Sequence, residues 1–194
     1  MVGIDFHQHQ IQGFFDIPVD HLYAAPVLVR YFREKALDDL VVVAPDVGSA
    51  KMARGYARRL KAGFAIIDKR RPAPNVAEVV NVVGEVDGKT CLLVDDMVDT
   101  GGTLVNAVHA LLERGAKAVY AAASHPLLSG PAVERLSQAP LEELVVTNTI
   151  DVPEERRFEK LRILSVAGLL ANAIQYIHSN ESVSALFEVP DEET

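Results

Sequence analysis

An apolar run followed by acidic, hydroxyl and glycine residues is the clearest chemical signal in the sequence. Residues 92–104 read LLVDDMVDTGGTL, so a strand-like run ends in two aspartates and leads through a turn into a helix. Gly101 and Gly102 allow backbone N–H groups to approach a ligand closely. The N-terminus of the following helix adds unpaired donors and a partial positive charge. Because Thr100 and Thr103 add hydroxyl donors, this order of residues predicts a cradle for a phosphate dianion.

Asp95 and Asp96 lie where the strand is expected to meet the ligand crevice of an open α/β sheet. Carboxylates there would repel a phosphate group but accept hydrogen bonds from vicinal hydroxyls. The acidic pair beside the cradle therefore suggests a sugar phosphate, with Asp95 and Asp96 on ribose O2 and O3. The alternative is a structural corner with a capping aspartate, which the combined acids, glycines and threonines disfavour. The Walker A and GxGxxG patterns of other phosphate loops are absent.

The overall composition limits the class of protein. The 194 residues carry a formal net charge of −8, whereas strong nucleic-acid binders are usually basic, so we expect no nucleic-acid partner. Cys91 is the single cysteine, and its apolar surroundings predict a buried, unreactive thiol. No apolar segment reaches the roughly 18 residues of a transmembrane helix, and the first residues lack signal-peptide features. We therefore expect a cytoplasmic protein with no membrane partner.

Strand-like and helix-like segments alternate along the chain. Short β-branched or apolar runs predict strands at residues 40–44, 64–68, 79–83, 91–96, 118–123 and 143–150. Helices are predicted at 50–60, 104–114 and 166–178, the last two from apolar residues at helical spacing. Residues 69–78, which include two prolines, predict a mobile loop. Repeated strand–helix units predict an α/β fold with a doubly wound, mainly parallel sheet.

The phosphate-loop stretch resembles the phosphoribosyl-pyrophosphate motif of type I phosphoribosyltransferases and of ribose-phosphate pyrophosphokinases. Other stretches are similar to the pyrophosphokinases in particular. They are DFHQHQIQGFFDIPVDHLYAAP at residues 5–26, VVVAPDVGSAKMAR at 41–54, IIDKRRP at 66–72, SHPLLSG at 124–130 and ESVSALFE at 181–188. The resemblance covers nearly the whole chain in order, and it implies a type I phosphoribosyltransferase-like fold.

The resemblance implies a reaction and a role for each matching residue. The reaction transfers the β,γ-diphosphoryl group of ATP to O1 of ribose 5-phosphate, giving 5-phosphoribosyl 1-pyrophosphate and AMP for nucleotide biosynthesis. His7 and Asp46 match the metal–ATP site with Mg²⁺ as cofactor, and Lys69 and Arg71 match a flexible catalytic loop. Asp95 matches a residue that binds the ribose hydroxyls, and we expect the neighbouring Asp96 to bind them as well. The ribose 5-phosphate loop is matched by Asp99, Thr100, Gly101, Gly102 and Thr103.

Taken singly, these residues also allow plainer interpretations. His7 could be a strand-end histidine that bonds to backbone, and Asp46 could cap the helix after it. Lys69 and Arg71 could belong to a solvated loop. Only their joint occurrence at family spacing favours the functional interpretation.

Two further histidines carry weaker signals. His9 departs from the family pattern and lies two residues from His7, so an extra metal ligand is one option for it. His125 begins a loop after a strand, where a structural role is favoured over contact with a nucleotide or regulator.

The resemblance implies a further N-terminal domain, and we expect most of that domain to be absent from these 194 residues. We expect residues 1–25 to be a remnant of that domain, 26–180 the phosphoribosyltransferase-like domain, and 181–194 a C-terminal segment with an acidic tail. A ribose-phosphate diphosphokinase polypeptide that forms homo-oligomers is the favoured hypothesis. The alternatives are a non-catalytic ribose 5-phosphate or phosphoribosyl pyrophosphate-binding or regulatory homologue, and a base phosphoribosyltransferase, for which no base-holding segment is recognisable.

Overall fold

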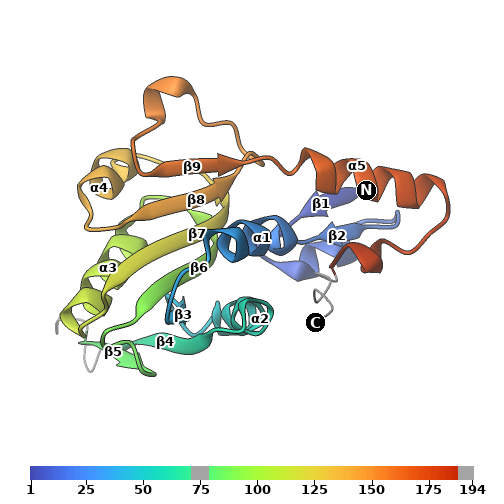
Figure 1. Cartoon of the computed structure of the whole chain (residues 1–194). Helices are drawn as coiled ribbons and strands as arrows, with labels where there is room; N and C mark the ends of the chain where they lie inside the picture. Colours follow the sequence, from blue (N-terminus) through green and yellow to red (C-terminus); the bar gives the residue numbers. More distant parts are fainter. Residues whose placement is uncertain (71–78, 188–194) are drawn as a thin grey trace.

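A computed structural model, which describes residues 1–70 and 79–187, contains a seven-stranded sheet with helices on both faces (Figure 1). The strands, in their order across the sheet, are β5 (Val79–Val83), β4 (Gly63–Arg70), β3 (Leu40–Ala44), β6 (Thr90–Val98), β7 (Ala118–Pro126), β8 (Glu143–Thr147) and β9 (Leu161–Leu164). Neighbouring strands are parallel except β4 and β5. The expected α/β fold with a mainly parallel sheet is confirmed.

The direction in which the chain builds the sheet reverses between β3 and β6. From β3 the chain passes through α2 (Ala50–Leu60) to β4, whereas from β6 it passes through α3 (Gly102–Glu113) to β7 on the other side. Ligands of open α/β sheets bind at such a switch point, beyond the carboxyl ends of the strands. Asp46 follows β3, and Asp95 and Asp96 belong to β6, so the topology brings these acids to one crevice.

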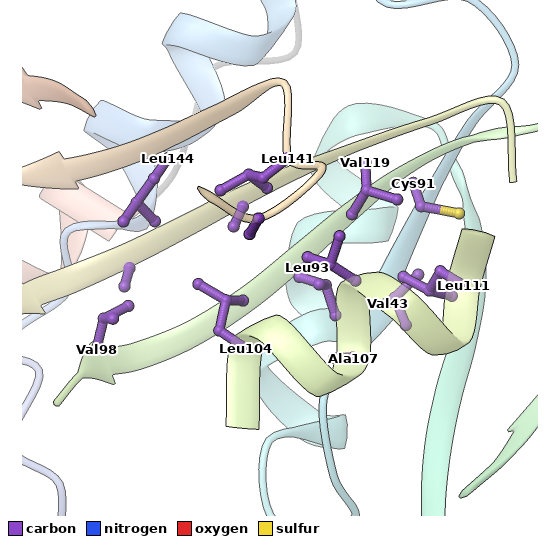
Figure 2. Packing of buried hydrophobic residues seen from close by; sticks show 14 of the residues in the cluster. Val43, Cys91, Leu93, Val98, Leu104, Ala107, Leu111, Val119, Leu141 and Leu144 are labelled. Carbon is purple, nitrogen blue, oxygen red and sulfur yellow. The ribbon is translucent and has the colours of Figure 1, made fainter. Parts of the chain in front are cut away.

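Apolar strands and helix stripes form a core on each face of the sheet. On one face α3 and α4 (Ala132–Gln138) pack on the strands, and Figure 2 shows Leu104 and Leu111 of α3 against Leu93 and its neighbours. On the other face α1 (Ala25–Lys35) and α2 cover the sheet, with Phe32 among the buried residues. Strands covered on both sides read as continuous hydrophobic runs. The expected burial of Cys91 is confirmed, and that burial raises the pKa of its thiol to about 11.

A small parallel sheet of β1 (Val2–Ile4) and β2 (Asp20–Leu22) lies beside the large one. A 3₁₀ helix, η1 (His9–Phe14), lies between the two strands in the sequence. Leu22 forms a separate cluster with Leu169 and Ala173 of α5 (Ala167–His178). In Figure 1, α5 and this small sheet extend together away from the large sheet. The N-terminal segment is thus held against the rest of the protein by contacts distant in sequence.

Several boundaries differ from the sequence predictions. β6 continues to Val98, so Asp95 and Asp96 lie inside the strand rather than at its end. The expected loop over residues 69–78 begins as strand through Arg70, and residues 71–78 lie outside the described part of the chain. Elements without a sequence prediction are α1, α4, β2, β9 and the 3₁₀ helices η1, η2 (Glu154–Arg156) and η3 (Val183–Phe187). Over residues 1–70 and 79–187, no helix is long and apolar enough to cross a bilayer.

Candidate functional site

The loop between β6 and α3 requires glycine at one of its two glycine positions. Gly101 has a φ of +74° and is the N-cap residue of α3. A Cβ there would lie 3.2 Å from Cγ of Leu136, so the backbone conformation and the packing both favour glycine. Gly102 has no positive φ, and a Cβ there would make only ordinary contacts, the nearest at 3.6 Å from Nη1 of Arg135. The conformational requirement therefore lies at Gly101.

The N-terminus of α3 opens directly onto this loop. Its first intrahelical hydrogen bond runs from the N–H of Val105 to the carbonyl of Gly101 at 3.0 Å. The N–H groups of Gly102, Thr103 and Leu104 precede that bond and have no partner within the helix. Such donors, at the positive end of a 12-residue helix, suit an anionic ligand. These unpaired donors are compatible with the predicted phosphate cradle, which stays a prediction.

Arg135 of α4 lies beside the loop at residues 99–103 and carries a positive charge. The sequence analysis did not predict a role for it. Its Nη1 donates to the carbonyl oxygen of Thr100 at 3.3 Å, and the two residues are 35 positions apart in the sequence. A guanidinium group matches the geometry of phosphate oxygens. Arg135 is therefore placed to add positive charge to the cradle. The separation in sequence explains why no local spacing pointed to it.

His7 and Asp96 meet across a long stretch of sequence. His7 Nδ1 lies 2.6 Å from Oδ2 of Asp96, although the residues are 89 positions apart. The hydrogen bond and charge of Asp96 raise the pKa of His7, and the carboxylates of Asp95 and Asp46 add to the effect. The His7 side chain stays 62% exposed, so solvent screens this pair. The fold thus brings together His7, expected at the metal–ATP site, and Asp96, expected at the ribose hydroxyls.

Asp95 is a carboxyl group in an unfavourable place for charge. The pKa of Asp95 is raised to about 7. Burial is the largest cause, the charges of Asp96 and Asp46 add to the rise, and a backbone hydrogen bond acts against it. That bond is donated by the N–H of Asp96 to Oδ1 of Asp95 at 3.0 Å. Perturbed carboxyl groups gather at functional sites because substrates or metals compensate them. Asp95 is therefore a strong candidate for a ligand-binding residue.

Asp46 lies in the turn between β3 and α2. Its Oδ1 accepts hydrogen bonds from the N–H and the hydroxyl of Ser49, both at 3.0 Å, and Ser49 is the N-cap residue of α2. Its charge also contributes to the raised pKa values of His7 and Asp95. Asp46 thus shapes the turn before α2 and adds negative charge to the crevice.

A divalent cation suits this group of residues in charge and donor type. A bound cation would favour the charged form of Asp95, whose pKa is raised by burial and, to a smaller extent, by the charges of Asp96 and Asp46. His7 offers Nδ1 to Asp96, which leaves Nε2 for a metal, an arrangement typical of metal-binding histidines. Among the described residues, however, no three His, Cys, Asp or Glu side chains converge as a metal cluster. Mg²⁺ would therefore need further oxygen ligands, such as water and substrate.

The two expected catalytic cations are only partly located. Lys69 belongs to β4, where its backbone pairs with Val80 of β5. β4 runs parallel to β3, so Lys69 lies toward the carboxyl edge of the sheet, where Asp46 follows β3. Arg71 lies outside the described residues. The roles of both residues stay predictions.

His9 contacts a second histidine. Its Nδ1 lies 3.1 Å from Nδ1 of His21, and the two ring centroids are 4.7 Å apart. The ring of His21 in turn stacks on Tyr23. This contact gives His9 a packing role, and the option of an extra metal ligand stays a prediction.

The sequence has close relatives among known enzymes. It is 56% identical over 187 residues to "Ribose-phosphate pyrophosphokinase" of Bacillus subtilis, which covers 96% of this chain and 59% of the relative. It is 58% identical over 189 residues to "Ribose-phosphate pyrophosphokinase 1" of Listeria monocytogenes, with 97% and 59% coverage. The chain therefore spans about three fifths of the length of these curated relatives.

Solved structures and a family description agree with this relationship. The phosphoribosylpyrophosphate synthetase of Mycobacterium smegmatis has a TM-score of 0.85 and 47% identity, covering 92% of this chain and 58% of that one. An APRTase from Giardia lamblia has a TM-score of 0.52 at 18% identity over 73% of this chain and 77% of its own, so it shares the fold alone. The family described as "Phosphoribosyl synthetase-associated domain" matches residues 69–188. With most of its length so matched, the chain belongs to the phosphoribosyl synthetase-associated domain family.

Proposed function

We propose that this chain carries the ribose 5-phosphate site and part of the metal–ATP site of a ribose-phosphate diphosphokinase. The observation that carries the proposal is the corner between β6 and α3. There the carboxyl groups of Asp95 and Asp96 lie just ahead of a loop whose Gly101 and helix N-terminus suit a phosphate group. An acidic pair for hydroxyls beside donors for phosphate matches the two ends of ribose 5-phosphate.

The proposed reaction joins two substrates at phosphorus. The O1 hydroxyl of ribose 5-phosphate attacks the β-phosphorus of ATP, the bond from that phosphorus to the α,β-bridging oxygen breaks, and AMP leaves. The O1 proton passes to solvent, and the product is 5-phosphoribosyl 1-pyrophosphate. Negative charge gathers on the transferred phosphoryl oxygens, so the site needs positioning and positive charge more than covalent help.

The residues of this chain would divide that work between them. The loop at residues 99–103 would hold the 5-phosphate, with Arg135 adding charge through its place beside Thr100. Asp95 and Asp96 would accept hydrogen bonds from the ribose hydroxyls, which orients O1. Lys69 and Arg71 would stabilise the transferred phosphoryl oxygens as charge develops on them.

His7 and Asp46 would hold Mg²⁺ beside this acidic group. His7 would offer Nε2, because Nδ1 is engaged by Asp96. Asp46 would offer the carboxylate oxygen that Ser49 does not bind. When bound, Mg²⁺ neutralises charge on the phosphate oxygens of ATP.

Calorimetric titration of the purified chain tests the sugar-phosphate site without requiring turnover. We expect ribose 5-phosphate to bind, and ribose without phosphate to bind at least about tenfold more weakly, a difference of ~1.4 kcal/mol. Asp99→Asn should weaken ribose 5-phosphate binding, whereas Asp38→Asn, a change at an exposed position after α1, should not. Equal affinities for ribose and ribose 5-phosphate would contradict the phosphate loop.

Activity measurements separate the proposal from its two alternatives. With ATP, Mg²⁺ and ribose 5-phosphate we expect little AMP release from this chain alone, because it spans 59% of its relatives' length. Turnover at the rate of a full-length relative would contradict a need for the remaining part. A change in a full-length relative's activity on adding this chain would support a regulatory homologue. Exchange of pyrophosphate with a nucleotide would instead support a base phosphoribosyltransferase.

We also propose that the chain self-associates and works in the cytoplasm. Large apolar side chains of the N-terminal segment are exposed, with Phe14 at 85% and Ile17 at 58%. Exposed apolar patches of this kind favour association. Light scattering after size-exclusion chromatography should therefore find more than one copy per particle, and Phe14→Ser should reduce that mass.

A further inference from the structure

Asp5, at the end of β1, holds an unusual backbone conformation through several hydrogen bonds. Its φ is +43°, in the left-handed region that few residues other than glycine adopt. Its N–H donates to the carbonyl of Leu22 at 2.9 Å. Its Oδ2 accepts the N–H of Ala24 at 2.9 Å and the hydroxyl of Ser124. A conformation of this kind persists only where the surroundings determine it.

His125 completes this set of contacts from β7. Its Nε2 lies 3.0 Å from the carbonyl oxygen of Asp5. A carbonyl only accepts, so Nε2 must carry the proton. Its Nδ1 lies 2.9 Å from the hydroxyl of Thr149. Both ring nitrogens of His125 thus have partners, which locks the orientation of the ring.

The anchor for Asp5 is rigid. Ser124 is 2% exposed and Thr147 is fully buried. The carbonyl of Ser124 accepts the hydroxyl of Thr147 at 2.7 Å, and the hydroxyl oxygen of Thr149 lies 2.9 Å from the same carbonyl. The hydrogen bonds of Asp5 are therefore linked to buried residues at the carboxyl ends of β7 and β8, and not to solvent.

The strand register connects this anchor to the site. β7 pairs with β6 so that Ala123 faces Asp95 and His125 faces Met97, which puts Ser124 alongside Asp96. Asp96 is the partner of His7, and Asp5 precedes His7 by two residues. One strand thus carries the carboxylate that His7 binds, and the neighbouring strand carries the anchor for the segment that delivers His7. The N–H of Phe6, between them, donates to Nε2 of His21 at 3.0 Å.

We propose that Asp5, Ser124 and His125 form a positioning unit that holds His7 in contact with Asp96. None of the three is assigned to touch substrate, and they act through the backbone turn at Asp5. Without them the turn would relax toward an ordinary φ, and the direction of the chain at His7 would change. The importance of the unit for catalysis rests on the proposed function, whereas its effect on His7 does not.

The proton position on the His7 ring is a direct test of this unit. Long-range ¹H–¹⁵N spectra of histidine side chains show which ring nitrogen is protonated, and His7→Gln identifies the His7 signals. At alkaline pH, where imidazoles are neutral, we expect the wild-type His7 proton on Nδ1, because that atom faces Asp96. His125→Leu should convert His7 to a mixture of tautomers. His125→Gln, which keeps a donor near the position of Nε2, should retain the wild-type signature.

A second variant tests the proposal independently, in case His125→Leu does not fold. Asp5→Gly keeps the positive φ accessible but removes the carboxylate that binds Ala24 and Ser124, so it too should lose the Nδ1–H signature. His178→Gln, at the end of α5, is the control and should leave His7 unchanged. Amide spectra and thermal unfolding establish that each variant is folded. A folded His125→Leu or Asp5→Gly protein whose His7 keeps its proton on Nδ1 would overturn the proposal.

Mn²⁺ titration, followed through broadening of the His7 ring signals, adds a readout that depends on the proposed function. We expect Asp5→Gly to weaken Mn²⁺ binding at His7 by about tenfold or more, the scale for losing support behind a metal ligand. Unchanged Mn²⁺ affinity in a variant that has lost the Nδ1–H signature would overturn the link between this unit and the metal. Failure of Mn²⁺ to reach His7 in the wild type would count against the proposed metal site, while the tautomer spectra would still decide the positioning role.

Discussion

The loop proposed to bind phosphate and the region around His7 are built in opposite ways. The stretch at residues 99–103 is one contiguous piece of chain that leads from β6 into the first turn of α3, and its backbone donors all come from this piece and the helix that it starts. The His7 region is assembled from residues far apart, with 89 positions between His7 and Asp96 and 119 between Asp5 and Ser124. The loop therefore depends on local backbone geometry, whereas His7 depends on how separate strands pack.

This difference predicts different responses to mutation. A change in the loop should act on ligand binding through one corner of the backbone. A change near His7 should spread through several hydrogen bonds and leave the loop intact. Four experiments test that separation, from the largest expected effect to the smallest.

Lys69→Ala should have the largest effect, in a protein that includes the rest of the enzyme. If the loop binds and other residues drive catalysis, ribose 5-phosphate affinity should stay nearly unchanged. The kcat should fall by about a hundredfold or more, because a cation that stabilises transition-state charge acts on turnover. Arg71→Ala should behave similarly and Arg70→Ala more mildly, with Lys51→Ala on the exposed side of α2 as control. A tenfold rise in the ribose 5-phosphate dissociation constant with unchanged kcat would identify Lys69 as a binding residue instead.

Gly101 and Gly102 form a matched pair within the loop. Gly101→Val introduces strain at φ +74° and a contact with Leu136, so it should destabilise the chain by about 1–3 kcal/mol and also weaken ribose 5-phosphate binding. Gly102→Val meets no such backbone conflict, so it should cost less than about 1 kcal/mol of stability. It should still weaken binding, because it fills the space beside Thr100 and Arg135. Unaltered affinity in Gly102→Val, measured by calorimetry, would mean that the loop does not surround the phosphate.

Asp95→Asn should stabilise the chain while harming its site. The pKa of Asp95 is raised from its ordinary value of 3.8 to about 7 in the folded state. Between these two pH values the folded chain keeps a proton on this carboxyl group, whereas the unfolded chain has released it. Stability therefore falls as pH rises from about 4 to about 7 and then levels. Asparagine removes this loss, so we expect a gain on the order of 1 kcal/mol at neutral pH and little gain near pH 4. Urea unfolding at both pH values measures it, and an equal gain at both would refute the ionisation cause.

The His7–Asp96 pair should give the smallest effect on stability. The pKa of His7 is raised in the folded state, so the pair with Asp96 stabilises the fold when the ring is charged. This stabilisation is fully present below pH 6.5, the pKa of the unfolded chain, and is lost as the pH rises through the higher pKa of the folded state. The side chain is 62% exposed, and solvent screening keeps that contribution small. An NMR titration should find the His7 pKa above 6.5 in the wild type and lower in Asp96→Asn. The same pKa in both proteins would show that the pair does not form in solution.

Most of the fold was predictable because its elements carry strong local patterns. The buried runs at β3, β6 and β7 read as strands, and the apolar stripe of α3 reads as a helix. β9 was missed because a four-residue, partly exposed edge strand has little pattern to detect. The signal for α1 was present, with Pro26 in its first turn and Leu28, Val29 and Phe32 buried on one side, and it was overlooked. The strand predicted at residues 91–96 ended too early because Asp95 and Asp96 interrupt the apolar run, whereas β6 continues through them to Val98.

The sequence by itself determined the corner between β6 and α3, since its turn, its glycines and the start of the helix are consecutive residues. Only the tertiary structure decided which of the two glycines bears the positive φ, and that Arg135 stands beside Thr100. It also decided that His7 meets Asp96 and that Asp5 is held by Ser124 and His125. The physical reason is that hydrogen bonds between separate strands depend on sheet order and register, which emerge when the whole chain packs.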